Sequence, residues 1–237
     1  MKDPEAAAEQ ALIDHLLQFV PPGKRERMEA VASQRTAHLQ VVLEDIFQPH
    51  NASAVVRSCE CFGIQHVHVI EKHCKFTPNR EVAMGSSKWI HLHRWQEPGG
   101  GNPRHCLRHL RESGIRIVAT SLDADSRPVS ELSMEKPTAL CFGTEEAGLS
   151  QEILEAADER IHIPMHGFTQ SFNVSVSVAL CLFALRERME REAPGWPLSP
   201  AQLREVYRLW LRKTIRNHDI IVRTYLRERG LSGSGKA

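Results

Sequence analysis

The chain has 237 residues, of which 41% are hydrophobic, 6% aromatic and 25% charged. These values are close to the average of soluble globular proteins, and they exclude a wholly disordered chain, a collagen and a long coiled coil. The net charge of +1 argues against a uniformly basic nucleic-acid-binding protein.

The N-terminal segment is expected to be helical. Apolar residues at helical spacing predict a helix over 5–20, which stops at Pro21-Pro22-Gly23, and a second helix over 24–33. The first ten residues lack the basic start and apolar run of a secretory signal, so we expect a cytoplasmic protein. No stretch approaches the roughly 18 apolar residues of a membrane span, so no membrane partner is expected. We assign residues 1–35 to an N-terminal helical extension.

From residue 36 onward, short β-rich runs alternate with helix-like segments. The predicted strands are 38–46, 66–70, 89–93, 115–122, 138–143 and 160–164. The predicted helices are 51–62, 79–85, 103–113, 150–157 and a longer one over about 173–192. The alternation predicts an α/β fold, with an open and mainly parallel sheet flanked by helices. We assign residues 36–193 to this domain.

A basic segment follows the domain. Pro194-Gly195-Trp196-Pro197 ends the long helix, and Ser199-Pro200 predicts the start of one or two more helices over 201–229. In these helices an arginine recurs every four residues, at Arg204, Arg208, Arg212 and Arg216. We assign residues 194–237 to a basic C-terminal helical extension.

The charge is distributed unevenly along the chain. Residues 1–185 carry 18 basic and 23 acidic side chains, whereas residues 186–237 carry 12 basic and 6 acidic ones. Such an asymmetry is typical of a polyanion-binding appendage on an ordinary domain. The alternative is that the arginines form an ordinary solvated helix face.

Two other patterns resemble binding motifs without meeting their requirements. The tail GLSGSGKA over 230–237 has the spacing of a P-loop, but it lacks the final Ser or Thr and the strand and helix that flank one. A group of histidines and cysteines suggests zinc, but the chain has no C-x-x-C pair, so no metal is expected. The group comprises Cys59, Cys61, His66, His68, His73 and Cys74.

Three polar segments carry more information than either pattern. They lie at 48–59, 142–150 and 161–176, and each alone reads as an ordinary loop or helix cap. Together they place small and polar residues just past the carboxyl ends of strands, where open α/β sheets bind ligands. They offer an arginine, carboxylates, amides and hydroxyls, but no Cys-His or Ser-His-Asp set. This inventory favours transfer between two bound substrates over covalent catalysis.

At these residues the chain resembles the SpoU branch of the SPOUT methyltransferase superfamily, and within it the TrmH-type tRNA 2′-O-methyltransferases. The motif N-x-x-x-x-x-R runs from Asn51 to Arg57, F-G-x-E-x-x-G-L-S from Phe142 to Ser150, and I-P-M-x-G-x-x-x-S-x-N-V-S-V from Ile163 to Val176. The resemblance covers residues from about 36 to 190. It departs from the usual pattern at Phe172, where Leu or Met is common, and at Phe168 and Thr169, which replace a more aliphatic pair.

The resemblance implies a fold, a cofactor and an assembly. It implies a deep trefoil knot in the C-terminal part of the domain, which cradles S-adenosylmethionine (SAM), and a homodimer with the active site at its interface. The implied cofactor-binding residues are Thr120, Gly143, Ile163 and Phe172. Much of this recognition is expected to use backbone groups around an apolar slot for adenine.

The resemblance also implies the catalytic residues, which are Arg57, Asn51, Glu145, Ser171 and Asn173. Arg57 matches the essential arginine that acts on the ribose 2′-hydroxyl across the dimer interface. A guanidinium resists deprotonation, so we expect Arg57 to bind the adjacent phosphate and position the 2′-oxygen. We expect Asn51 and Glu145 to orient this arginine, and Ser171 and Asn173 to position the ribose.

The extensions favour one substrate. Short N-terminal helices and a basic C-terminal extension resemble the members of this branch that methylate guanosine 18 in the tRNA D-loop. The four arginines at 204, 208, 212 and 216 are then expected to grip tRNA phosphates. The alternatives are methylation of ribosomal RNA or of another tRNA position, a catalytically silent RNA-binding module, and a SAM-dependent transferase acting on a small molecule.

Overall fold

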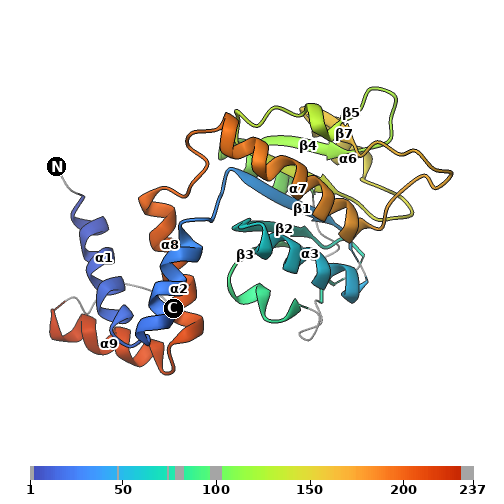
Figure 1. The fold of residues 1–237 in the computed structure, drawn as a ribbon. Coiled ribbons are helices and arrows are strands. Elements are labelled where there is room, and N and C mark those ends of the chain that lie inside the picture. The colour runs from blue at the N-terminus through green and yellow to red at the C-terminus, as the bar shows by residue number, and fades with distance from the viewer. Residues whose placement is uncertain (1–2, 47, 74, 78–82, 97–102, 231–237) are drawn as a thin grey trace. The chain divides into compact units, whose positions relative to one another are not determined.

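The computed structural model describes residues 3–46, 48–73, 75–77, 83–96 and 103–230, and the chain divides into two compact units (Figure 1). One unit is Arg35–Pro197, and the other combines the two ends of the chain, up to Gln34 and from Leu198. The N-terminal and C-terminal helical extensions, which we predicted as two separate segments of the chain, therefore belong to one compact unit. Most of the predicted helix over 79–85, Cys74 and nearly all of the glycine-rich tail lie outside the described residues.

The larger unit is built on a seven-stranded sheet in which every described strand pair is parallel. This confirms the predicted open α/β sheet. The strand order is β3-β2-β1-β6-β4-β7-β5. The chain runs outward from β1 to β3, crosses to β4 and to the edge strand β5, and then returns to place β6 beside β1 and β7 between β4 and β5. The strands are β1 (Leu39–Glu44), β2 (His66–Ile70), β3 (His91–Trp95), β4 (Arg116–Thr120), β5 (Arg127–Pro128), β6 (Thr138–Phe142) and β7 (Glu159–His162).

Helices cover both faces of the sheet. Alternate residues of the central strands belong to two separate apolar clusters, because successive side chains of a strand point to opposite faces. On one face Val41, Leu43 and Val118 join α3 (Pro49–Cys61) and α7 (Val174–Glu192), which pack against each other. On the other face Val42 and Ile117 join α5 (Pro103–Glu112) and α6 (Gln151–Ala156). Two short 3₁₀ turns, η1 (Ser86–Lys88) and η2 (Val129–Glu131), complete the described elements of this unit.

The central strands explain why both faces must be covered. All six residues of β1 and all five of β6 are buried, as expected for strands of a parallel sheet that lies between two helical layers. Their register pairs Leu39 with Thr138 and Leu43 with Phe142, so both strands end at the same edge. The loops that follow them are therefore neighbours. A trefoil knot through these loops stays a prediction of the family resemblance.

The smaller unit is helical. Its elements are α1 (Pro4–Leu17), α2 (Pro22–Ala32), α8 (Pro200–Thr214) and α9 (His218–Glu228). Helix α1 packs against both α8 and α9, and the His15 ring lies 4.6 Å from the ring of Tyr225. Ser199 starts α8 with a capping box, in which its side chain and that of Gln202 bond to each other's backbone N–H groups. Helix α8 buries Val206, Trp210 and Leu211.

Candidate active site

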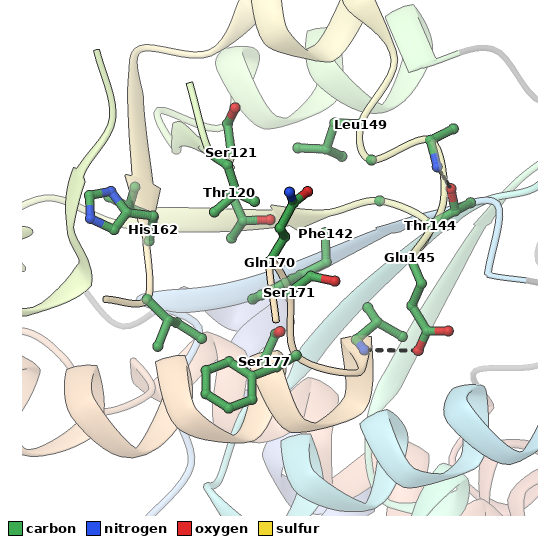
Figure 2. A pocket seen from close by; sticks show the side chains of 18 of the residues that line it. Thr120, Ser121, Phe142, Thr144, Glu145, Leu149, His162, Gln170, Ser171 and Ser177 are labelled. Carbon is green, nitrogen blue, oxygen red and sulfur yellow. Dashed lines mark hydrogen bonds between the residues drawn. The ribbon is translucent and has the colours of Figure 1, made fainter. Parts of the chain in front are cut away.

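A pocket of about 430 Å³ opens at the carboxyl ends of β4, β6 and β7 (Figure 2). Its walls are the loops that follow these strands and the first turns of α7. The volume lies within the range of small-molecule sites, and the position is the one at which open α/β sheets bind ligands. Two of the three polar segments of the sequence, 142–150 and 161–176, contribute to its lining, whereas no residue of 48–59 is part of that lining.

All four residues that the resemblance implied for the cofactor line this pocket, namely Thr120, Gly143, Ile163 and Phe172. Two of the implied catalytic residues, Glu145 and Ser171, line it as well. The Thr120 hydroxyl donates to the Cys141 carbonyl oxygen over 2.8 Å. This bond ties the end of β4 to β6.

The loop between Gly143 and Ser150 forms one wall and is tightly folded. Thr144 and Gly148 exchange backbone hydrogen bonds of 3.1 and 3.0 Å, and the Thr144 hydroxyl accepts the Ala147 N–H over 3.0 Å. Gly148 has a φ of 67°, a conformation that glycine adopts without strain. A Cβ at Gly143 would lie 2.0 Å from the Gly148 carbonyl oxygen, so only glycine fits there. We refer to residues 143–150 as the pocket loop.

A cluster of two amides and a carboxylate joins the three motifs beside the pocket. The Glu145 Oε1 atom accepts from Asn51 Nδ2 over 3.1 Å, from Asn173 Nδ2 over 2.5 Å and from the Val174 N–H over 3.1 Å. Asn173 Nδ2 also donates to Asn51 Oδ1 over 3.1 Å. The Asn173 Oδ1 atom accepts the Ser175 N–H over 2.9 Å and thereby caps α7. The structure thus brings Asn51, Glu145 and Asn173 together.

Arg57 stands apart from this cluster within one chain. It lies on α3, two turns after Asn51, and its side chain is exposed. Arg57 is not among the described residues that line the pocket, and within the described part of the chain it makes no recorded ion pair or hydrogen bond. An exposed, unpaired guanidinium is available to a phosphate or to a second copy of the chain.

The pocket fits SAM in its chemistry. Apolar side chains suited to an adenine ring, among them Phe142, Leu149 and Ile163, alternate with polar groups such as Ser121 and Gln170. Burial raises the pKa of the Cys181 thiol, which also lines the pocket, to about 12, so this thiol stays protonated at neutral pH. The site therefore offers placed polar groups, and the Cys181 thiol in it is not an activated nucleophile.

Sequence reasoning missed one buried residue next to the pocket loop. The carboxylate of Glu44, the last residue of β1, accepts the Ser150 N–H over 2.7 Å at the end of this loop. The available signal was a charged residue at the end of an otherwise largely apolar strand, which also occurs in strands without any site.

The four arginines predicted to bind RNA lie on α8 and just after it in the helical unit. Arg204 and Arg208 both pair with Glu9 of α1, over 2.7 and 3.1 Å, whereas Arg212 and Arg216 are exposed. These pairs lower the pKa of the Glu9 carboxyl, although its partial burial opposes them. One negative charge of the N-terminal segment therefore offsets part of the arginine stripe.

Neither a metal cluster nor a membrane span was found in the described part of the chain. No group of three or more His, Cys, Asp or Glu side chains there is arranged to hold a metal ion. Likewise, no helix of the described residues is both long and apolar enough to cross a bilayer.

The fold and site define an α/β protein with a small-molecule pocket at the carboxyl ends of its parallel strands, and comparison with known proteins specifies its family. The SpoU rRNA Methylase family profile matches residues 38–183. The chain is 40% identical to the tRNA (guanosine(18)-2′-O)-methyltransferase of Borreliella burgdorferi over 206 residues. The aligned region covers 87% of this chain and 92% of that protein. This chain belongs to the SpoU methylase family, as the three motifs predicted.

Solved structures agree with this assignment. The crystal structure of the A. aeolicus TrmH/SpoU tRNA modifying enzyme matches with a TM-score of 0.69 and 30% identity, over 87% of this chain and 100% of that one. An AdoMet-bound rRNA methyltransferase from Sinorhizobium meliloti matches with a TM-score of 0.56 and 25% identity, over 66% of this chain and 58% of that one. The chain is an RNA 2′-O-methyltransferase with the fold of this family.

Proposed function

We propose that this protein transfers a methyl group from SAM to the ribose 2′-oxygen of guanosine 18 in the D-loop of tRNA. The observation that carries the proposal is the convergence of the three motifs on one site, where Asn51, Glu145 and Asn173 bond to one another beside the pocket. The tRNA target is supported by the name of the Borreliella burgdorferi relative, which is similar over most of both chains.

The pocket residues would bind and orient the cofactor. When bound, SAM supplies a methyl group on a positively charged sulfur. Thr120, Gly143, Ile163 and Phe172 would hold SAM through backbone groups and apolar contact. The adjacent amide–carboxylate cluster would fix the start of α7, so that Ser171 and Asn173 can position the ribose.

Arg57 would bind the substrate phosphate next to the reacting ribose and hold the 2′-oxygen in line with the methyl group. A guanidinium remains protonated in proteins, so its contribution is charge and bidentate geometry rather than proton abstraction. Placing two reactants in line removes much of the entropic cost of their encounter.

The arginine would reach its site from the partner subunit of a homodimer. Helix α7 exposes an apolar stripe at i, i+4 and i+7, formed by Val176, Leu180 and Phe183, whose exposed fractions are 43%, 39% and 72%. Helix α3, which carries Arg57, packs against α7. A stripe of this kind is suited to an isologous dimer contact, which would bring Arg57 of one subunit toward the pocket of the other.

The chain termini would supply RNA affinity in the cytoplasm. We propose that residues 1–35 and 194–237 extend the methyltransferase domain of residues 36–193 and bind tRNA. Arg204, Arg208, Arg212 and Arg216 would contact phosphates there, because guanidinium groups bind phosphate oxygens in a bidentate manner.

Methyl transfer from labelled SAM to unmodified tRNA transcripts tests this function directly. The purified protein should label tRNA, and mapping should place the 2′-O-methyl group at guanosine 18. Ribosomal RNA in a parallel reaction should remain unlabelled. Transfer to ribosomal RNA or to another tRNA position would identify one of the alternative substrates, and transfer to neither RNA would refute the proposal.

A further inference from the structure

Two neighbouring strands, β1 and β2, each end at a buried carboxylate, at the edge of the sheet where the pocket lies. Glu44 is the last residue of β1, and Glu71 directly follows β2, which pairs with β1. They are only 3% and 6% exposed. Each has one basic partner: Glu44 pairs with Lys72 over 2.5 Å, and Glu71 pairs with Arg94 over 3.3 Å. A buried charge is costly to maintain, so such a residue needs a structural or functional reason.

The two carboxylates differ in the backbone group that they hold. The Glu71 Oε1 atom accepts the Phe76 N–H over 2.5 Å, which stabilises the connection that follows its own strand. The Glu44 Oε2 atom accepts the Ser150 N–H over 2.7 Å, more than a hundred residues later in the chain. Ser150 ends the pocket loop, and residues 143–149 of that loop all line the pocket. Of these two carboxylates, therefore, only Glu44 contacts the pocket loop.

The pocket loop is held at two places. Near its start, Glu145 bonds to Asn51, Asn173 and the Val174 N–H. At its end, the buried Ser150 hydroxyl has no hydrogen-bond partner among the described residues, so the side chain does not anchor this point. The bond between the Ser150 N–H and the Glu44 carboxylate then fixes the end of the loop. Hydrogen bonds to an ionised acceptor are about twice as strong as neutral ones.

We propose that Glu44, with Lys72 as its counter-ion, is a positioning residue that holds the pocket loop in the conformation that binds SAM. This inference rests on the proposed function, because it takes SAM as the ligand of the pocket. Glu44 acts through the loop and does not touch the cofactor itself. Loss of its charge should therefore weaken SAM binding more than it weakens the fold.

The chain offers a matched control for the test. Glu44→Gln and Glu71→Gln each remove one buried negative charge and leave one basic side chain without its carboxylate. A third variant, Ser150→Pro, removes the amide donor, together with the unpartnered Ser150 hydroxyl, while Glu44 and Lys72 both remain. The ring carbon that replaces the N–H hydrogen displaces the Glu44 carboxylate from the loop, and the φ of −64° at Ser150 suits proline. Circular dichroism and thermal melting first establish that each full-length variant is folded.

Titration calorimetry with SAM, followed by steady-state kinetics, separates the outcomes. We expect Glu44→Gln and Ser150→Pro to raise the Kd and KM for SAM by about tenfold, while the KM for tRNA stays within about twofold. Glu71→Gln should keep the Kd for SAM of the unchanged protein. Unchanged SAM affinity in Glu44→Gln and Ser150→Pro would overturn the inference, as would an equal loss in Glu71→Gln. If the unchanged protein itself does not bind SAM, the proposed function fails instead.

Discussion

At Gly143 the backbone of the pocket loop passes so close to itself that no side chain fits. A Cβ there would lie 2.0 Å from the Gly148 oxygen and 2.4 Å from the Leu149 nitrogen, both of which are backbone atoms that cannot rotate away. Gly143→Ala should therefore displace the pocket loop and reduce SAM affinity by at least about tenfold, at a cost of about 1–3 kcal/mol in stability. Calorimetric titration with SAM measures the effect.

The control for this prediction is Gly195→Ala, since a Cβ at Gly195 meets nothing within 4 Å. This variant should bind SAM with the affinity of the unchanged protein. Normal SAM binding by Gly143→Ala would show that the pocket loop is not part of the cofactor site.

Arg57 is the residue to which we assign a chemical rather than a structural role. It is exposed and makes no recorded ion pair with the described residues, so its removal should leave the fold and SAM binding largely intact. We expect Arg57→Ala to slow methyl transfer by at least about 100-fold. Arg57→Lys keeps the charge but not the bidentate geometry and should restore only a small part of the rate. Single-turnover transfer assays give the rates, and full activity of Arg57→Ala would refute the role.

At the scale of elements, β2 and β3 share a cluster of stacked imidazole rings. The His66 Nδ1 and His93 Nε2 atoms lie 2.9 Å apart. The ring of His91 lies 5.1 Å from that of His66, and the ring of His109 lies 6.3 Å from that of His93. Burial, followed by the neighbouring histidines, lowers the pKa of His66 to about 3 and that of His93 to about 4. His68, 4.5 Å from His93, is shifted downward as well for the same reasons.

This cluster predicts a loss of stability in mild acid. The unfolded histidines take up protons near pH 6.5, whereas the folded ones do so only below about pH 4. The histidine contribution to the free energy of unfolding should therefore be constant above about pH 7 and should fall between pH 6.5 and 4, by up to about 1.4 kcal/mol per pH unit for each shifted histidine. Urea unfolding at pH 7.5, 6.5 and 5.5 measures the slope. His66→Phe/His93→Phe should flatten it, and an unchanged slope would contradict the assignment.

The four arginines on α8 and just after it differ in their ion-pair partners. Arg204 is 18% exposed and is held by Glu9, which also contacts Arg208, whereas Arg212 and Arg216 face solvent. We expect Arg212→Gln/Arg216→Gln to weaken tRNA binding and to lower the slope of log K against log salt by about 2. Arg204→Gln/Arg208→Gln removes the same charge and should change the slope less. Filter binding at several salt concentrations tests both pairs, and equal slopes in all proteins would support the solvated-face alternative.

The sequence could predict which residues form helices and strands better than it could predict the order of the strands within the sheet. The prediction for β2 coincides with His66–Ile70, because alternating histidine and β-branched residues between turns are a strong local signal. Strand β5, Arg127–Pro128, was not predicted because two residues show no periodicity and one of them is proline. The strand order depends on long-range pairing, which no local pattern contains. The polar cluster followed from the motifs, whereas Glu44 has no motif of its own.

At the scale of the whole molecule, the two ends of the chain form one helical unit. The sequence predicted both sets of helices, but their association depends on contacts between α1 and α8 and on the Glu9 ion pairs, almost 200 residues apart. The basic segment of residues 186–237 is thus partly offset by acidic residues of the N-terminus. Neither the net charge of +1 nor the charge of one segment describes the surface that RNA would meet.

The proposed dimer makes each active site depend on two chains, and mixed dimers test this dependence. Arg57→Ala keeps an intact pocket, and Gly143→Ala keeps an intact arginine, so each protein alone should be nearly inactive at a SAM concentration well below the Kd of Gly143→Ala. If Arg57 acts on the partner's pocket, a mixed dimer has one complete site. Random mixing after co-expression makes about half of the dimers mixed, so about a quarter of full activity should return.

A third substitution shows whether this recovery needs the α7 stripe. Phe183 is 72% exposed on that stripe, so Phe183→Asp added to both proteins should produce monomers in sedimentation experiments and abolish the recovered activity. Phe19→Asp is the control, because Phe19 is an exposed phenylalanine of the helical unit and lies outside the stripe. No activity in mixed dimers would mean that Arg57 serves the pocket of its own chain, and recovered activity that persists with Phe183→Asp would show that the recovery does not need the α7 stripe.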